Sequence, residues 1–197
     1  MSGFDTSLRA SSVVNLSSAV TMVVDDSPFA LDLTCQALLG FGIRTRYACR
    51  SAAEAIRILK ESPVDLVLVD CEMPGTDGFE MVRWLRRSGL DPNAFTPIIM
   101  TAAHLRRSRA TEARDCGASF VIVKPFSPVT LLERIVWVSR DQRPFLEVGD
   151  YFGPDRRFRD GSPPGDERRE QMIRKAAAQA EAAAQGTAEV IESSVPS

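Results

Sequence analysis

Four apolar runs in this sequence end in polar residues that could take part in chemistry. Asp25 and Asp26 follow the first of these runs, and Asp70 follows a later one. Thr101 and Lys124 end the two runs after that. Clustered carboxylates repel one another, and a cation such as Mg²⁺, which prefers oxygen ligands, removes that repulsion. A lysine and a threonine beside them could bind phosphate oxygens, so this set of side chains points to phosphoryl transfer onto a carboxylate.

These polar residues can share one site only if the runs before them are parallel strands. Short, nearly continuous apolar segments alternate with segments of helical periodicity between residues 19 and 140. The predicted strands are 20–24, 43–48, 65–69, 97–100 and 119–123, and the predicted helices are 28–40, 52–61, 79–87, 105–116 and 128–138. Apolar strands of this kind are typical of a sheet covered on both faces, and the alternation gives right-handed crossovers. We therefore predict a doubly wound α/β domain with its ligand site beyond the carboxyl ends of the strands.

Four sequence segments carry a specific resemblance. The segments VVDDS, LVLVDCEMPGTDGFEM, PIIMTA and FVIVKPF occur in this order within residues 19–140. Together they resemble the receiver domain of two-component response regulators. The resemblance implies a flavodoxin-like fold, in which five helices cover a five-stranded parallel sheet of order 2-1-3-4-5.

The resemblance also implies roles for the acidic residues. Asp70 would accept a phosphoryl group from the phosphohistidine of a histidine kinase or of a histidine phosphotransfer protein. Asp26, Asp70 and the backbone carbonyl of Glu72 would bind Mg²⁺ directly. Asp25 would act mainly through a metal-bound water.

The remaining rim residues would bind the phosphoryl group and take part in the switch. The resemblance places Thr101, Ala102 and Lys124 at these positions. It also implies a cis peptide bond between Lys124 and Pro125, an option that is essentially specific to proline.

This sequence departs from the family pattern in three places. Many receivers carry Tyr or Phe three residues before the lysine, whereas this chain has Val121 there and Phe120 one residue earlier. The side chains of consecutive strand residues point to opposite faces, which puts the usual aromatic switch in doubt. Glu72 could overhang the phosphoryl group and affect its hydrolysis, and Ala103 offers no polar side chain to steer a water molecule.

Composition excludes several other classes. The formal net charge is −2 and the isoelectric point is about 5.6, so no basic excess favours nucleic acid. No apolar run approaches the roughly 18 residues of a membrane helix, and the N-terminus does not resemble a secretory signal. The four cysteines are scattered, and the single histidine, His104, has no metal-ligating neighbour in sequence, so we expect free thiols and a plain loop histidine. We expect a cytoplasmic protein that binds neither nucleic acid nor membrane.

The chain divides into five parts by composition. A flexible lead-in (1–18) precedes the receiver domain (19–140), and an extension rich in aromatic residues and arginine (141–165) follows it. A candidate Ala-rich helix (166–185) and a disordered tail (186–197) complete the chain. The extension resembles those of some stand-alone bacterial receivers, and it could dock on a partner, fold back on its own domain or serve only as a linker. Its candidate docking residues are Tyr151, Phe152, Arg156, Arg157 and Phe158.

Three functions compete at this point. The first is a signalling receiver, not an enzyme, that acts through an unknown downstream protein or as a phosphorelay intermediate or sink, since no output domain fits after Arg140. The second is a Mg²⁺-dependent phosphatase of the haloacid-dehalogenase kind, which also uses a strand-end aspartate. That family requires a second aspartate where this chain has Glu72, and its acidic pair lies downstream of the nucleophile, whereas Asp25 and Asp26 lie upstream. The third is a structural adaptor in which phosphorylation is vestigial.

Overall fold

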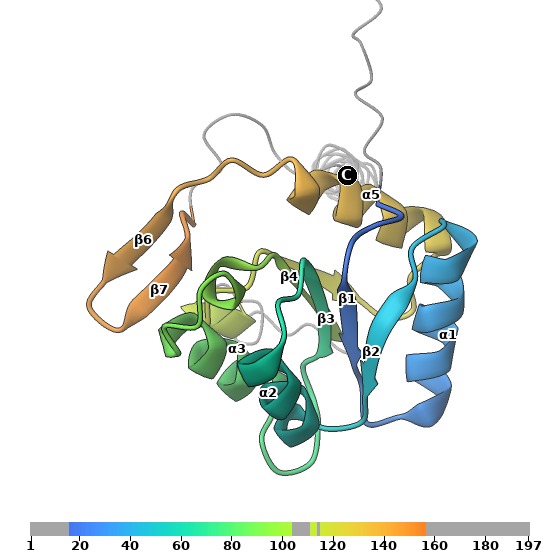
Figure 1. Cartoon of the computed structure of the whole chain (residues 1–197), viewed down its shortest axis with the longest axis horizontal. Helices are drawn as coiled ribbons and strands as arrows, with labels where there is room; N and C mark the ends of the chain where they lie inside the picture. The colour runs from blue at the N-terminus through green and yellow to red at the C-terminus, as the bar shows by residue number, and fades with distance from the viewer. Residues whose placement is uncertain (1–15, 104–110, 114, 157–197) are drawn as a thin grey trace, which may run out of the picture. The chain divides into compact units, whose positions relative to one another are not determined.

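A five-stranded parallel sheet forms the centre of the molecule in the computed structural model, which describes residues 16–103, 111–113 and 115–156 (Figure 1). Its strands are β1 (Thr21–Val24), β2 (Thr45–Cys49), β3 (Leu66–Asp70), β4 (Ile98–Ala102) and β5 (Phe120–Val123). They are ordered β2-β1-β3-β4-β5, and every neighbouring pair is parallel. The predicted doubly wound, flavodoxin-like fold is confirmed.

The helices begin where the sequence offers capping side chains. They are α1 (Pro28–Gly40), α2 (Ala52–Glu61), α3 (Gly78–Arg87) and α5 (Pro128–Ser139). Ser27, Ser51 and Ser127 each accept a hydrogen bond from a first-turn backbone amide, and Asp77 forms a reciprocal capping box with Glu80 at the start of α3. These caps satisfy first-turn amides that would otherwise lack partners, and they thereby determine where each of these helices begins.

Alternate strand residues build two cores, one on each face of the sheet. Val67 and Val69 of β3 pack in the cluster that includes side chains of α2 and α3, whereas Leu68 packs in the cluster that includes α1 and α5. This is the period-two geometry of a strand. It explains why β3 reads as one continuous apolar run in the sequence.

Parts of the predicted organisation fall outside the described residues. Of the predicted helix 105–116, residues 111–113 and 115 are described and helical. Most of the lead-in, residues 157–165 of the extension, the candidate helix 166–185 and the tail 186–197 lie outside the described residues, as does His104. None of the helices in the described part of the chain is long and apolar enough to span a bilayer.

Residues 145–154 form an antiparallel hairpin that is not among the predicted elements. Strand β6 (Phe145–Val148) pairs with β7 (Tyr151–Pro154), and Gly149 in the connecting turn has a φ of 56°. That conformation favours glycine, and a Gly-Asp pair between β-forming residues is a recognised hairpin signal. The segment EVGDYF therefore contains a hairpin signal that an analysis of composition does not detect.

The hairpin packs against the end of the domain at which β4 and β5 begin. The rings of Phe145 and Phe152 pack against the ring of Phe95 in the 3₁₀ helix η1 (Asn93–Phe95), with centroid separations of 5.1 and 5.4 Å. Gly117 lies against β7, because a Cβ at Gly117 would be 2.6 Å from the Phe152 carbonyl oxygen. The structure thus shows residues 141–156 folded back on their own domain, which is one of the three alternatives left open by the sequence.

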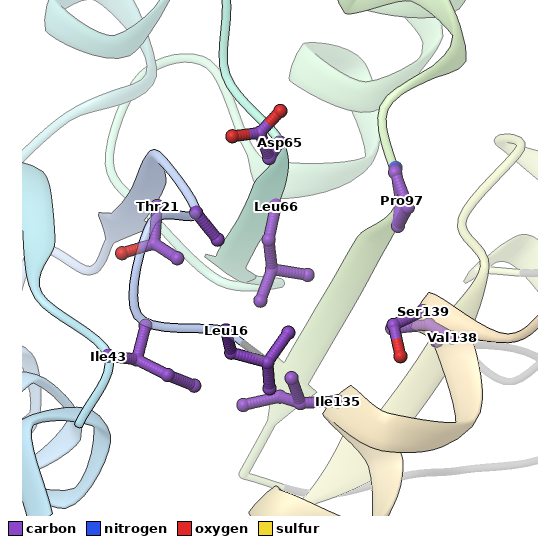
Figure 2. A pocket seen from close by; sticks show the side chains of 10 residues that line it. Leu16, Thr21, Ile43, Asp65, Leu66, Pro97, Ile135, Val138 and Ser139 are labelled. Carbon is purple, nitrogen blue, oxygen red and sulfur yellow. The ribbon is translucent and has the colours of Figure 1, made fainter. Parts of the chain in front are cut away.

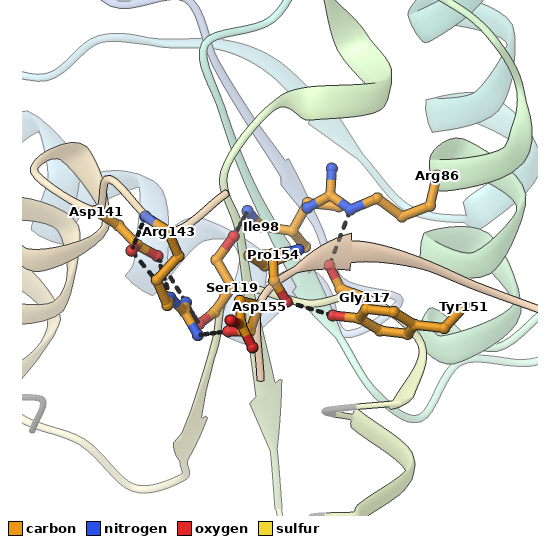
Figure 3. Close-up of polar contacts among 9 residues, drawn as sticks. All are labelled: Arg86, Ile98, Gly117, Ser119, Asp141, Arg143, Tyr151, Pro154 and Asp155. Carbon is orange, nitrogen blue, oxygen red and sulfur yellow. Dashed lines mark hydrogen bonds and ion pairs between the residues drawn. The ribbon is translucent and has the colours of Figure 1, made fainter. Parts of the chain in front are cut away.

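Arg86 is a buried residue whose side chain bonds to several segments at this end of the domain (Figure 3). Its side chain donates to the carbonyl oxygens of Gly117 (2.9 Å), Ala94 (2.7 Å) and Thr96 (2.9 Å), and its guanidinium lies 5.1 Å from the centroid of Phe145. Burial lowers the pKa of Arg86 to about 10, so the group still carries its charge at neutral pH. One residue of α3 thereby links the starts of β4 and β5 to the hairpin.

A pocket of about 230 Å³ opens near the amino ends of β1 and β3 (Figure 2). Leu16, Ile43, Leu66 and Ile135 give it a mostly apolar lining, and Asp65 is its one carboxylate. The Asp65 carboxylate already accepts a hydrogen bond from the Val20 amide (2.7 Å). The pocket lies at the opposite end of the strands from Asp70 and contains none of the predicted site residues.

Candidate functional site

Asp70 is the last residue of β3 and lies at the carboxyl end of the sheet. Its neighbour in register on β4 is Thr101, whose hydroxyl donates to the Asp70 carboxylate at 3.3 Å. The Glu72 amide donates to the other carboxylate oxygen at 2.9 Å. Asp70 is only 7% exposed, so the end of the strand and the following turn hold its carboxylate in a fixed orientation.

Lys124 bridges two carboxylates across the sheet. It directly follows β5, and its ammonium lies 2.5 Å from Asp70 and 2.8 Å from Asp25. Burial alone would lower the pKa of Lys124, but the hydrogen bonds and charges of Asp25 and Asp70 outweigh it, so the pKa is raised. The lysine is therefore charged at neutral pH and offsets the repulsion between two largely buried carboxylates.

The acidic pair after β1 is divided between a buried and a partly exposed residue. Asp25 is 4% exposed and accepts a hydrogen bond from the Ser27 amide (3.0 Å) at the start of α1. Asp26 is partly exposed, and Glu72 is exposed. The two carboxylates of the pair thus face different surroundings, with only Asp25 engaged by Lys124.

The remaining predicted residues lie at the same rim. Ala102 is buried at the end of β4, where its carbonyl oxygen accepts from the Lys124 amide at 2.8 Å, and Ala103 is exposed. The peptide bond between Lys124 and Pro125 is cis. These contacts place the lysine directly beside the end of β4.

Gly78 allows the rim to close around Asp70, and the sequence analysis had not singled it out as a site residue. A Cβ at Gly78 would lie 2.1 Å from the Asp70 carbonyl oxygen, so no other residue fits there without displacing the end of β3. Gly78 is also the first residue of α3, directly after its capping Asp77. A glycine immediately after a helix-capping aspartate was the available signal.

The donor chemistry of the rim suits a hard divalent cation. Asp25, Asp26 and Asp70 offer carboxylate oxygens, and the Glu72 carbonyl adds a neutral one, which is the ligand type that Mg²⁺ prefers. In the described part of the chain, no three His, Cys, Asp or Glu side chains are grouped as a formed metal site. Lys124, between two of these carboxylates, supplies the positive charge in this structure.

The aromatic residue near Lys124 packs away from the usual switch position. Phe120 belongs to the core of the α1 and α5 face, where its ring lies 5.6 Å from that of Trp137, with the Arg134 guanidinium 4.8 Å from its centroid. Val121 packs against the opposite core. As predicted, the two side chains lie on opposite faces, and the large ring is fixed against α5.

The candidate docking residues that the structure describes make contacts within the chain. Phe152 packs against Phe95, and the Tyr151 hydroxyl donates to the Pro154 carbonyl oxygen. Arg156 lies over the Tyr151 ring, with 3.9 Å from its guanidinium to the ring centroid. Arg157 and Phe158 lie outside the described residues.

The cysteines all lie within the described residues and form no disulfide. Cys49, Cys71 and Cys116 are buried, and Cys35 is partly buried. Burial raises the pKa of Cys49 to about 12 and that of Cys116 to about 11, so these two thiols stay protonated at neutral pH.

Fold and rim together define a class: a doubly wound α/β protein with an aspartate, a threonine and a lysine converging at the carboxyl ends of its strands. The response regulator receiver domain family matches residues 21–136, and the chain belongs to this family. The chain is 32% identical over 136 residues to the phosphate regulon transcriptional regulatory protein PhoB of Pseudomonas aeruginosa, covering 65% of this chain and 57% of PhoB. It is 27% identical over 114 residues to chemotaxis protein CheY-3 of Vibrio cholerae, covering 58% of this chain and 86% of CheY-3.

Solved structures agree with this assignment. The chemotaxis protein CheY4 of Vibrio cholerae aligns with a TM-score of 0.56 and 30% identity, over 61% of this chain and 98% of CheY4. Whereas the matched region spans nearly all of CheY4, it spans little more than half of PhoB. The likeness therefore concerns the receiver domain, and the hairpin of β6 and β7 lies after the matched residues 21–136.

Proposed function

We propose that this chain is a response regulator in which Asp70 accepts a phosphoryl group from a histidine kinase or a histidine phosphotransfer protein. The observation that carries the proposal is the convergence of Thr101 and Lys124 on the Asp70 carboxylate, with Lys124 also paired to Asp25. The cation and the hydroxyl that now bond to this carboxylate can instead form charge-assisted hydrogen bonds with the oxygens of a phosphoryl group attached to it.

In the proposed reaction, an Asp70 carboxylate oxygen attacks the phosphorus of a phosphohistidine on the donor. The new O–P bond forms as the N–P bond breaks, and the imidazole leaves with a proton from solvent. Lys124 and the Thr101 hydroxyl, both already directed at Asp70, pair with the phosphoryl oxygens. The Glu72 amide keeps the second carboxylate oxygen oriented throughout.

Mg²⁺ belongs to this proposal as the resident cation of the phosphorylated state. Asp26, Asp70 and the Glu72 carbonyl would hold it, with Asp25 acting through a bound water. When bound, it neutralises charge on the transferring phosphoryl group. Lys124, which bridges Asp25 and Asp70 in this structure, would then pair with the phosphoryl oxygens beside the metal.

The output we propose is protein–protein contact, or passage of the phosphoryl group along a relay or into a sink. The protein would act in the cytoplasm, with neither nucleic acid nor membrane as a partner. The haloacid-dehalogenase alternative gains no support, because Glu72 is exposed and its backbone, rather than its carboxylate, meets Asp70. Family membership likewise places the chain among signalling proteins.

The test is intact mass spectrometry after incubation with Mg²⁺ and acetyl phosphate. We expect one added phosphoryl group on the wild type and none on Asp70→Asn. Asp32→Asn, which alters an exposed carboxylate on α1, is the matched control and should be labelled like the wild type. Equal labelling of Asp70→Asn would disprove the assignment of the phosphoacceptor, and fast consumption of acetyl phosphate without an adduct would favour the phosphatase.

A further inference from the structure

The hairpin segment is attached to the receiver domain by two contacts of different strength. One is a buried group around Arg143, here called the anchor, which consists of Asp141, Arg143 and Ser119. The other is an ion pair between Arg156 and Asp115, here called the latch. The two contacts attach neighbouring parts of one segment to different parts of the domain.

The anchor is built into the start of β5 (Figure 3). Arg143 donates to the Ser119 carbonyl oxygen (3.0 Å) and forms an ion pair with Asp141 at 2.6 Å, and these two charged side chains are only 12% and 11% exposed. Arg143 also donates to the Asp155 carbonyl oxygen (3.0 Å) and lies 5.2 Å from the Trp137 centroid. Ser119 itself is bonded to the start of β4 through the Ile98 amide (3.1 Å), so the anchor rests on the central sheet.

The latch, by contrast, is on the surface and joins the hairpin to the helical segment before β5. Arg156 and Asp115 are 3.0 Å apart, and their side chains are 39% and 43% exposed. The guanidinium of Arg156 also stacks on the Tyr151 ring, 3.9 Å from its centroid. Partly exposed ion pairs are weak, so a small displacement of Asp115 is enough to open the contact.

The segment that carries Asp115 also touches the strand that carries Thr101. Ala113 and Cys116 are buried in the same core as Met100, and the Cys116 sulfur, whose thiol can donate to the Ala113 carbonyl oxygen (3.0 Å), lies 3.6 Å from the Met100 sulfur. Met100 directly precedes Thr101, which is bonded to Asp70. A continuous set of contacts therefore runs from the Asp70 carboxylate to the helical segment held by the latch.

We propose that the latch opens when Asp70 is phosphorylated, while the anchor stays closed. This inference rests on the proposed function of Asp70. The phosphoryl group takes over the Thr101 hydroxyl and Lys124, the end of β4 moves with Thr101, and the segment packed on Met100 moves with it. The phosphorylation state is thereby passed to the chain at Arg156, at the opposite end of the domain.

Linkage makes the coupling reciprocal. The structure shows the latch closed while Lys124 bridges Asp25 and Asp70, so the latch stabilises this unphosphorylated arrangement. Removing it should therefore favour the phosphorylated arrangement. An ion pair of this exposure corresponds to about a two- to fivefold change in the equilibrium.

The direct test is hydrogen–deuterium exchange on the full chain with Mg²⁺, before and after acetyl phosphate. We expect the amides of residues 115–117, in the helical segment that the latch holds, to exchange about two- to fivefold faster once mass spectrometry shows the adduct. The amides of residues 145–148 and 151–155, which are held by the hairpin ladder and the anchor, should stay protected. An adduct without faster exchange at residues 115–117 overturns the latch and leaves the proposed function intact. If the wild type forms no adduct, the proposed function itself fails, and the latch falls with it.

The reciprocal test uses beryllium fluoride, an equilibrium mimic of the phosphoryl group, titrated by calorimetry with Mg²⁺. Arg156→Ala and Asp115→Ala should each bind it about two- to fivefold more tightly than the wild type, and the double variant no more tightly than either. Arg57→Ala removes a more exposed ion pair, with Glu61 on α2, and should leave the affinity unchanged. Unchanged affinity in both latch variants would contradict the coupling.

Discussion

Lys124 and Arg86 show how the two ends of one sheet use a cation for different purposes. Lys124 lies at the carboxyl ends of the strands, where its partners are two carboxylates and its side chain is 25% exposed. Arg86 lies near the amino ends of β4 and β5, is 2% exposed, and donates to three neutral carbonyl oxygens. Each cation ties segments together that are distant in the sequence.

The two cations differ in the chemistry of their hydrogen-bond acceptors, which are carboxylates for Lys124 and backbone carbonyls for Arg86. Carboxylates can be phosphorylated or bind a metal, and a flexible ammonium can follow the change in charge. Backbone carbonyls cannot change, and a planar guanidinium fits several of them at once, so the contacts of Arg86 are permanent. One end of the sheet thus carries groups that can change their charge, whereas the other carries contacts that hold the hairpin in place.

Replacing Arg86 should have the largest effect on stability. Arg86→Met leaves the carbonyl oxygens of Ala94, Thr96 and Gly117 buried without their donor, and we expect the free energy of unfolding to fall by about 3 kcal/mol or more. Arg83→Ala, on the same helix, removes only a partly exposed ion pair with Glu112 and should cost no more than about 1 kcal/mol. Urea denaturation followed by circular dichroism measures both. Similar losses in the two variants would contradict the structural role given to Arg86.

A methyl group at Gly78 should have a smaller effect, concentrated at the changeable end. Gly78→Ala places a Cβ against the Asp70 carbonyl oxygen, and we expect it to lower the free energy of unfolding by about 2 kcal/mol. It should also reduce labelling of Asp70 by acetyl phosphate, because the end of β3 must shift. Gly40→Ala is the control, since a Cβ there meets nothing within 4 Å, and it should be neutral or slightly stabilising. A neutral Gly78→Ala would show that the rim is more adaptable than its geometry implies.

The same contrast separates what could be predicted from the sequence and what could not. The strand ends were predictable because a parallel sheet brings the ends of its apolar runs to one edge, and Asp70, Thr101 and Lys124 meet there. The opposite faces of Phe120 and Val121 followed from strand periodicity alone. These features depend on local pattern and topology.

The hairpin end could not be predicted in the same way. An arginine in the last turn of an amphipathic helix, such as Arg86, ordinarily faces solvent. Here it contacts residues before β4 and β5 and the Phe145 ring of the hairpin, and it is buried. The contacts of Arg143 with Ser119 and of Arg156 with Asp115 likewise link distant segments without periodicity. Tertiary contacts of single polar residues leave no pattern in one sequence, although the turn at Gly149 does.

The smallest predicted effect concerns Lys124 and can be recognised by its pH dependence. Removing its ammonium leaves Asp25 and Asp70 facing each other, and because the site is partly solvated, we expect Lys124→Met to cost about 1 kcal/mol near neutral pH. The pKa of Lys124 is raised in the folded protein. Its contribution is therefore fully present below the pKa of an unfolded lysine, roughly 10.4, and is lost as the pH rises through the higher folded value.

Denaturation at a series of pH values should accordingly show a constant gap between wild type and Lys124→Met from about pH 7 to 9, which closes above about pH 10.5. Lys60→Met is the control, because Lys60 is exposed and its contact with the Trp84 ring, at 5.8 Å, involves no carboxylate. Its effect should be smaller than that of Lys124→Met at neutral pH. A gap for Lys124→Met that persists unchanged into strong alkali would mean that packing of the lysine stem, rather than its charge, stabilises the rim. In that case Lys124 and Arg86 would differ only in how deeply they are buried, and not in how their charges stabilise the two ends of the sheet.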